Sequence, residues 1–167
     1  MRFYTALVDN KEEILVGFTP GSTAYRLPLL ASLAPELAFR DMNALILGYS
    51  EKVKATLARL EANDDVLSRA EVRLSEVQLL APIVRPRQDV VCLGINYDAH
   101  AQEAGRFSDE AFGGERPYTI YFSKRVNRAT ATGEKVPAYA GLVDSLDYEV
   151  ELGVILGRDA KNVSRAA

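Results

Sequence analysis

The chain has 167 residues, of which 48% are hydrophobic and 26% are charged. These proportions are ordinary for a globular protein with a sizeable core, and they exclude an intrinsically disordered chain. With 20 basic and 23 acidic residues the net charge is −3, and no long run of one sign gives the footprint expected of a nucleic-acid-binding or membrane-binding protein. Small molecules are therefore the expected partners.

The cysteine content and the N-terminal residues predict a cytoplasmic protein. Cys92 is the only cysteine, so no intrachain disulfide can form, and its place in an apolar run indicates a buried thiol rather than a reactive one. The first nine residues are too short and too mixed for a secretory signal, and no apolar stretch approaches the roughly 20 residues of a membrane span.

The first 80 residues predict a small α/β domain. Apolar or β-branched stretches separated by turn residues predict three strands, at residues 3–8, 14–18 and 25–29. Between residues 42 and 60 the apolar positions recur at helical spacing, with Asp41 placed to cap the first turn and residues 63–65 closing the last. A strand with alternating character follows at residues 72–79.

A domain boundary is predicted near residue 81, because Pro82 and Pro86 exclude a regular helix or a central strand. The first domain would then comprise residues 1–80 and the second residues 81–167. The second part has strands joined by long loops, at residues 90–97, 118–122 and 148–156. The predicted fold class is therefore α+β, a small α/β domain followed by a β-rich domain that we expect to be incomplete within these 167 residues.

Three acidic residues recur at every second position in the segment 147–151. In a strand, Asp147, Glu149 and Glu151 would share one face and Tyr148 would lie on the other. Such a face can simply meet water. Alternatively, two carboxylates about 6 to 7 Å apart along a strand can converge on a hard divalent cation such as Mg²⁺ or Mn²⁺. Taken alone, this E-x-E pattern is a weak motif.

His100 and Glu103 are the second candidate pair. An apolar strand ends at Gly94, and the residues up to Gly105 predict a short helix on which His100 and Glu103 share one face. A lone histidine is often only solvated or structural. Paired with a carboxylate at contact spacing, however, it has the parts of a general base.

Three cations, Lys124, Arg125 and Arg128, follow the apolar strand that ends near residue 122. They either form a solvated strand end or bind the carboxylate of an anionic substrate.

In their order along the chain, these motifs resemble the fumarylacetoacetate hydrolase family, including its shorter bacterial acylpyruvate hydrolases and oxohepta-enedioate isomerases and hydratases. The pattern G-x-N-Y-x-x-H-x-x-E-x-G begins at Gly94, a strand ends in F-x-K at Lys124, and D-Y-E-x-E-L begins at Asp147. The resemblance covers residues 72–167 through specific motifs and the N-terminal domain more weakly.

The resemblance implies a role for each candidate residue. Glu149 and Glu151 would bind Mg²⁺ or Mn²⁺, and His100 with Glu103 would activate water. Lys124, which we group with the neighbouring Arg125 in a substrate-binding site, would lie on the substrate side. The implied reaction is hydrolysis of a carbon–carbon bond in a 2,4-dioxo acid of the fumarylacetoacetate or acylpyruvate type, with the metal stabilising the enolate.

Other functions remain open at this point. A decarboxylase, isomerase or hydratase of 2-oxo acids would use the same enolate chemistry, and a non-catalytic binding or assembly module is a further alternative. The family's third metal-binding acid has no counterpart before residue 167, which predicts that this chain alone is a poor catalyst. The expected partners are a small anionic 2-oxo acid and either a second copy, as in a homodimer, or a polypeptide that completes the domain.

Overall fold

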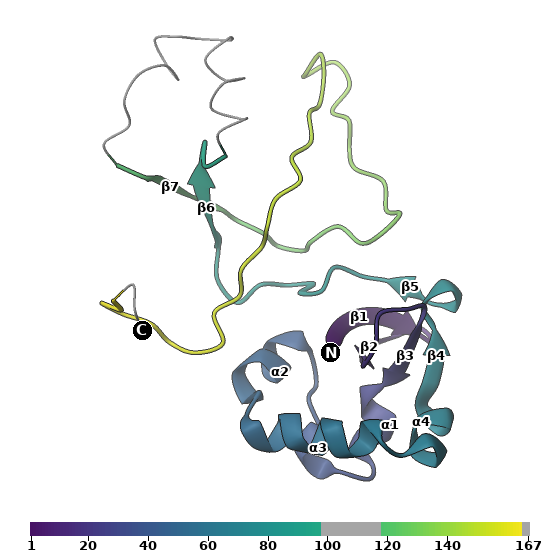
Figure 1. Ribbon diagram of the computed structural model, residues 1–167. Coiled ribbons are helices and arrows are strands. Elements are labelled where there is room, and N and C mark those ends of the chain that lie inside the picture. The colour runs from purple at the N-terminus through teal and green to yellow at the C-terminus, as the bar shows by residue number, and fades with distance from the viewer. Residues whose placement is uncertain (98–117, 165–167) are drawn as a thin grey trace. The chain divides into compact units, whose positions relative to one another are not determined.

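The computed structural model describes residues 1–97 and 118–164, which form a mixed α/β chain (Figure 1). It divides into two compact units, one made of Met1–Val84 with Ala129–Ala167 and the other of Arg85–Arg128. No helix within the described ranges is both long and apolar enough to cross a membrane. The domain division at residue 80 stays a prediction.

The first unit begins with a tight β-hairpin. Strands β1 (Arg2–Val8) and β2 (Lys11–Gly17) pair antiparallel from Arg2↔Gly17 to Val8↔Lys11. The two linking residues, Asp9 and Asn10, have positive φ angles of 50° and 60°. Asp and Asn tolerate this left-handed conformation, which a two-residue hairpin turn requires at both positions.

Five antiparallel strands form the sheet, in the order β4-β3-β2-β1-β5. The three further strands are β3 (Thr23–Arg26), β4 (Glu71–Arg73) and β5 (Gln78–Leu79). Residues 74–77, which include the 3₁₀ turn η2 (Leu74–Glu76), connect one edge strand to the other. A flat sheet would separate these edges by about 19 Å, more than the roughly 17 Å that five extended residues reach. The sheet is therefore curled.

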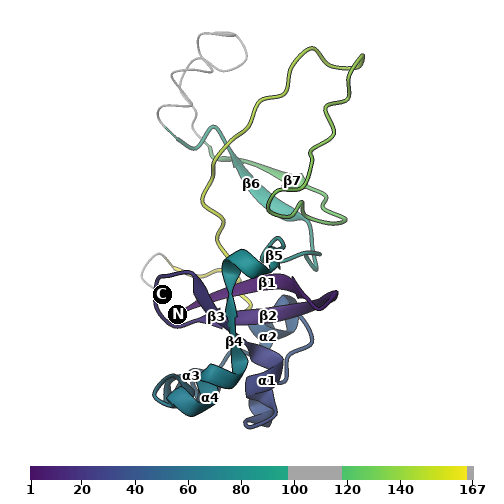
Figure 2. The same cartoon turned by 90° about the vertical axis from the view of Figure 1, so that its right-hand side faces the viewer.

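The helices cover one face of this sheet (Figure 2). They are α1 (Leu27–Ala31), α2 (Met42–Gly48), α3 (Glu51–Glu61) and α4 (Asp64–Ala70), with the 3₁₀ turn η1 (Pro35–Leu37) between α1 and α2. Ile14 and Val16 point from β2 into this layer, whereas Leu15 between them packs on the opposite face with Ala6, Val8 and Ala24. Both faces of the sheet are therefore apolar and covered.

Several predictions in this unit are wrong. The single strand expected at residues 72–79 is two short strands, β4 and β5, separated by η2. The single helix expected at residues 42–60 is two helices, because Tyr49 is extended and the Ser50 side chain accepts a hydrogen bond from Val53 N to start α3. Asn63 does not close that helix but caps the next one, by accepting from Val66 N at 3.2 Å. The strand expected at residues 25–29 ends at Arg26, and Pro28 lies in the first turn of α1, where its missing N–H costs nothing.

Residues 129–134 return to the N-terminal sheet. Ala129 N donates to Val84 O at 2.9 Å, and Thr132 N donates to Leu79 O at 3.2 Å. The side chain of Ala131 is buried, and its N–H donates to the Glu134 carboxylate at 2.7 Å. The first unit is therefore discontinuous in sequence, because it is built from both sides of the second unit.

The second unit contains an antiparallel pair of strands, β6 (Val90–Gly94) and β7 (Ile120–Lys124). Their register runs from Val90↔Lys124 to Gly94↔Ile120. The two strands predicted at residues 90–97 and 118–122 are thus confirmed with shifted ends. Cys92 is half-buried rather than buried, because this ribbon has only two strands within the described residues.

The strand predicted at residues 148–156 is not formed in the described part of the chain. This segment has no regular secondary structure, and Tyr148, Val150 and Leu152 are each more than 80% exposed. Alternating apolar residues favour a strand only where a neighbouring strand supplies a hydrogen-bonding ladder, and no ladder includes these residues.

Candidate active site

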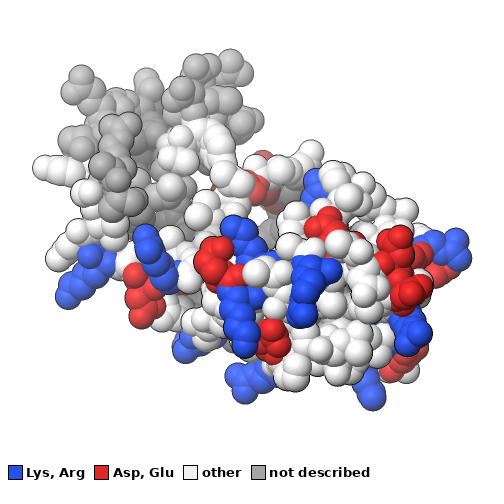
Figure 3. Space-filling view, turned by 60° about the horizontal axis from the view of Figure 1, so that its bottom comes forward, with Lys and Arg blue, Asp and Glu red and all other residues white. Residues whose placement is uncertain are grey.

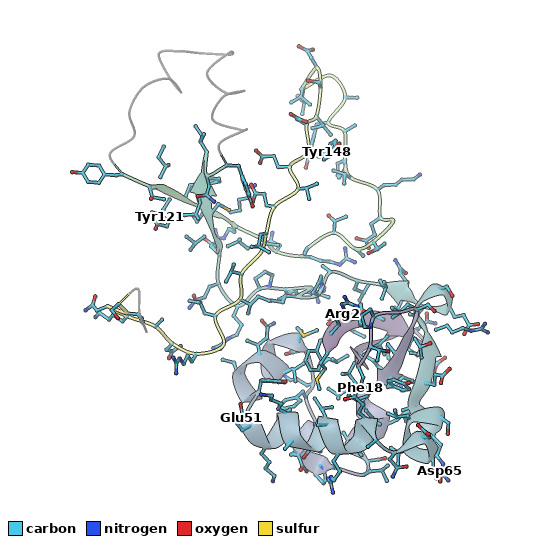
Figure 4. The ribbon with its side chains drawn as sticks, viewed as in Figure 1. Arg2, Phe18, Glu51, Asp65, Tyr121 and Tyr148 are labelled. Carbon is cyan, nitrogen blue, oxygen red and sulfur yellow. The ribbon has the colours of Figure 1, made fainter. Side chains whose placement is uncertain are left out.

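The acidic pair Glu149 and Glu151 lies in an exposed segment of the first unit without helix or strand. Figure 4 labels Tyr148 on this segment. The preceding acid, Asp147, accepts a hydrogen bond from Tyr148 N at 2.8 Å. All three acids of the predicted trio, Asp147, Glu149 and Glu151, are exposed.

Carboxylate oxygens are the ligands that Mg²⁺ and Mn²⁺ prefer, so the chemistry of Glu149 and Glu151 fits a hard divalent cation. Such cations bind six or more oxygens, and two glutamates leave several positions for water or substrate. Among residues 1–97 and 118–164, no three His, Cys, Asp or Glu side chains group closely enough to hold a metal ion. The described residues therefore supply part of a coordination sphere.

The two residues predicted to activate water, His100 and Glu103, lie outside the described residues. Their roles stay predictions.

The predicted substrate-binding residues, Lys124 and Arg125, lie in the second unit at the end of β7. Lys124 pairs with Val90 across the ribbon, and its Nζ lies 5.8 Å from the centroid of the Phe122 ring. Both cations are exposed. The aromatic ring of Phe122 attracts the ammonium group of Lys124 without neutralising its charge.

Sequence reasoning missed two further cations at this position. Arg85 and Arg87 precede β6, and the antiparallel register puts the start of β6 beside the end of β7. In the sequence alone, the prolines of this segment indicate only a domain boundary. The sequence does show an arginine on each side of Pro86. These arginines point to the end of β7 only once the pairing of β6 with β7 is known.

Two groups of the first unit's sheet, Tyr25 and Arg26, have raised pKa values. Burial, followed by the nearby carboxylates of Glu71, Asp64 and Glu61, raises the pKa of Tyr25. The Glu13 carboxylate raises the pKa of Arg26 by accepting two hydrogen bonds, from Nε at 2.9 Å and from Nη2 at 2.7 Å. The pair Glu13 and Arg26 joins β2 to β3, and Tyr25 packs against the hydrophobic core. We therefore assign all three side chains a structural role.

The electrostatics of the scaffold surface are mixed. Figure 3 shows basic and acidic side chains interspersed over the N-terminal unit. Several are arranged in pairs, for example Lys54 with Glu51 and Arg73 with Glu76. Exposed pairs of this kind contribute little to stability or binding.

Comparison with known proteins finds a similarity in the second half of the chain. Residues 89–167 match the family model described as fumarylacetoacetate (FAA) hydrolase C-terminal. The oxaloacetate tautomerase YisK of Bacillus subtilis is 36% identical over 102 residues, which cover 61% of this chain and 32% of that protein.

Two relatives of unassigned function are similar as well. A protein of Staphylococcus saprophyticus is 27% identical over 95 residues, covering 57% of this chain and 29% of the relative. One of Staphylococcus epidermidis is 27% identical over 120 residues, covering 71% and 36%. The chain thus spans about a third of the length of the curated relatives it matches. The matched segment includes Glu149, Glu151, Lys124 and the predicted His100–Glu103 pair, and in this segment the chain is similar to the fumarylacetoacetate hydrolase family.

Proposed function

We propose that this chain takes part in the metal-dependent conversion of a small 2-oxo acid through its enol or enolate, with keto–enol tautomerisation as the leading reaction. The observation that carries the proposal is the acidic pair Glu149 and Glu151 within a segment that matches the family. The choice of tautomerisation is supported by the similarity to a relative named an oxaloacetate tautomerase.

In this proposal Glu149 and Glu151 hold a divalent cation, Mg²⁺ or Mn²⁺, as enzymes of the family generally do. When bound, the cation polarises the 2-oxo group and stabilises negative charge on the enolate oxygen. Because the carboxylates are exposed, a substrate can reach the cation that they bind.

The remaining roles concern protons and the substrate's charge. His100 accepts a proton from the carbon next to the 2-oxo group and returns it, and Glu103 stabilises the protonated imidazole. Lys124 and Arg125 bind a carboxylate of the substrate, a role that suits their exposure at the end of β7.

Hydrolysis of a carbon–carbon bond in a 2,4-dioxo acid is the second candidate. It uses the same enolate but needs an activated water, for which His100 and Glu103 have the required chemistry. The spacing of these two residues within the matched segment favours this candidate over a pure binding module. A decarboxylase or hydratase would differ only in the bond that breaks or forms next to the enolate.

We also propose that the protein works in the cytoplasm and as a homo-oligomer, with a small anionic 2-oxo acid as ligand. A single cysteine in 167 residues suits a reducing compartment. The exposed apolar side chains of the segment around Tyr148 and Val150 support association with a second chain.

The test is a tautomerase assay on the purified chain. The keto–enol relaxation of oxaloacetate is followed by ultraviolet absorbance with Mn²⁺ present, against Mn²⁺ alone and against the double variant E149A/E151A. We expect acceleration above both controls, and a loss of rate on the order of 10²- to 10⁴-fold in His100→Ala with little change in Mn²⁺ affinity. Decay of an acylpyruvate without oxaloacetate relaxation would select hydrolysis. Rates equal to Mn²⁺ alone with both substrates would contradict the proposal.

A further inference from the structure

The segment that leads from the first unit into the second is held against strand β1. Leu80 N donates a hydrogen bond to Thr5 O at 2.8 Å, and the Thr5 hydroxyl donates to Pro82 O at 2.6 Å. Ile83 packs against the core between the sheet and the helices, and Val84 is buried. The segment around Pro82, where the sequence predicts a domain boundary, is therefore a fixed part of the first unit.

The hydroxyl of Thr5 is a specific anchor for this segment. The Thr5 side chain is 2% exposed, and Thr5 pairs with Ile14, whose side chain points into the helical layer. A buried hydroxyl requires a hydrogen-bond partner, and the carbonyl oxygen of Pro82 is its acceptor. Replacement of Thr5 by valine, which has the shape of threonine, would therefore weaken the attachment of the segment to β1 and leave the core filled.

A second stretch of chain, which follows β7, binds the same segment. Ala129 N donates to Val84 O at 2.9 Å, and Thr132 N donates to Leu79 O at 3.2 Å. The partners follow each other in opposite order along the two stretches, as they do in antiparallel strands. The first segment is thus hydrogen-bonded both to β1 and to the second.

A closed turn gives the second segment its shape. Ala131 N donates to the Glu134 carboxylate at 2.7 Å, and Ala131 O accepts from Glu134 N at 3.1 Å. Gly133, at the third position of the turn, has a φ angle of 77°, which favours glycine. The Ala131 side chain is 6% exposed, so a larger, charged side chain at this position would displace the turn from its contacts.

The two segments meet where the chain leaves and re-enters the first unit. Val84 lies six residues before β6 begins at Val90, and Ala129, to which Val84 is hydrogen-bonded, lies five residues after β7 ends at Lys124. With this contact closed, the loop that must be ordered to pair Val90 with Lys124 has about 11 residues rather than about 34. Because the closure probability falls with the 3/2 power of loop length, the shorter loop favours pairing by about fivefold. A two-stranded ribbon is marginally stable alone, so this contribution affects how often the ribbon opens.

We infer that residues 79–84 and 129–134 form a clamp, a conformational element that closes on β1 and thereby stabilises the pairing of β6 with β7. Its two segments close as one element, because the hydrogen bonds at Leu79 and Val84 join them directly. The N-terminal sheet therefore contributes to the stability of a ribbon that lies in the segment matching the family. This role is independent of the proposed reaction, because none of the clamp residues is a candidate metal-binding or substrate-binding residue.

Hydrogen exchange of the full chain, measured by mass spectrometry, tests the clamp. The peptides of interest cover its two segments, β6 and β7, and the β1–β2 hairpin serves as the reference for global unfolding. Ala131→Glu introduces a charge at the buried position, and Ala138→Glu, at an exposed position of the same stretch, is the charge-matched control. Thr5→Val removes the anchoring hydroxyl, and Thr130→Val, at an exposed position, is its control.

We expect Ala131→Glu to accelerate exchange by about tenfold or more in both clamp segments and by about fivefold in β6 and β7, while the hairpin keeps its protection. Thr5→Val should accelerate exchange in residues 129–134 together with residues 79–84, although Thr5 is remote from the former in the sequence. Both controls should change exchange by about twofold or less.

If Ala131→Glu abolishes the protection of the hairpin, the chain has unfolded globally and Thr5→Val decides. Faster exchange confined to residues 79–84 in Thr5→Val, or to residues 129–134 in Ala131→Glu, would overturn the clamp. A ribbon without protection in the unaltered chain, or equal effects of Ala131→Glu and Ala138→Glu, would overturn it as well.

Discussion

Single carboxylates in this protein are placed in two contrasting ways. Glu36 accepts a hydrogen bond from the hydroxyl of Thr56, 2.8 Å away and on α3, and the Thr56 side chain is buried. Glu149 and Glu151 are exposed in a segment without regular structure. The first arrangement stabilises a carboxylate within the fold, and the second places two carboxylates on an exposed segment.

The exposed pair is expected to bind metal. Glu149→Ala or Glu151→Ala should each weaken Mn²⁺ binding by about tenfold or more, because each removes one of two anionic ligands. Calorimetry with Mn²⁺ measures this. Glu12→Ala, an exposed acid on β2, is the control and should leave Mn²⁺ affinity unchanged. Unchanged binding in both Glu149 and Glu151 variants would refute the assignment.

Glu36 should contribute to the pH dependence of stability. Its own backbone N–H and then the Thr56 hydroxyl lower the pKa of the Glu36 carboxyl below its usual value of 4.5. A lowered folded-state pKa means that the unfolded chain binds the proton more readily. The stabilisation is therefore present above pH 4.5 and is lost as the pH falls through the lowered pKa.

Urea denaturation of the chain and of Glu36→Gln between pH 7 and pH 3 measures this effect. We expect the wild type to be the more stable at pH 7 and its advantage to shrink in acid. Thr56→Val, which keeps the shape of the side chain but removes the hydroxyl, should reduce the same advantage. A constant difference between wild type and Glu36→Gln at every pH would contradict the prediction.

At the scale of elements, helix boundaries follow local capping signals. The side chain of Asp41 accepts a hydrogen bond from Ala44 N at 2.8 Å and starts α2, and Ser50 starts α3 in the same manner. Tyr49 between them is extended, so the apolar periodicity of residues 42–60 continues across a break in the backbone. Periodicity alone therefore could not reveal two helices, whereas the serine cap could.

Removal of the Asp41 cap should destabilise the N-terminal unit. Asp41→Ala is expected to cost about 1 kcal/mol in the free energy of unfolding, since it leaves the first-turn N–H of α2 without its acceptor. Asp41→Asn keeps an acceptor oxygen and should cost much less. Thermal unfolding followed by circular dichroism compares the variants. Equal losses in Ala and Asn variants would indicate that the charge, rather than the cap, is what stabilises the helix.

At the scale of the whole molecule, apolar side chains are distributed unevenly. In the first 84 residues most of them are gathered on the two covered faces of the curled sheet. In the segment from Val136 to Val163 the large apolar side chains are exposed, with Val150 at 87% and Leu152 at 81%. At about 25 cal/mol per Å² of apolar surface, covering several such side chains is worth several kcal/mol.

Self-association of the purified chain is the expected consequence, with a second copy covering these side chains. Sedimentation velocity should show species larger than a monomer that increase with concentration. Val150→Ser should shift the distribution toward the monomer, and Leu47→Ser, at an exposed position of α2, should leave it unchanged. A monodisperse monomer at every concentration, for the chain itself, would contradict the expectation.

Local sequence determined the features that depend on a few neighbouring residues. The Asp9–Asn10 turn follows from the left-handed conformations these residues tolerate, the cap at Asp41 from its side-chain acceptor, and the family motifs from residue spacing. The acids and the cations Lys124 and Arg125 could be selected as candidates on the same grounds.

Only the tertiary structure decided the rest, because pairings between distant residues depend on register and on which surface is covered. The curl of the sheet follows from the short connection between its edge strands, and the return of residues 129–134 to Leu79 and Val84 could not be inferred from their composition. The antiparallel register of β6 and β7 likewise brings together two arginine-containing segments that are about 40 residues apart in the sequence. The alternating pattern of residues 148–156 favours a strand. A strand also needs backbone hydrogen bonds to a neighbouring strand, and the residues of this segment cannot provide that neighbour themselves.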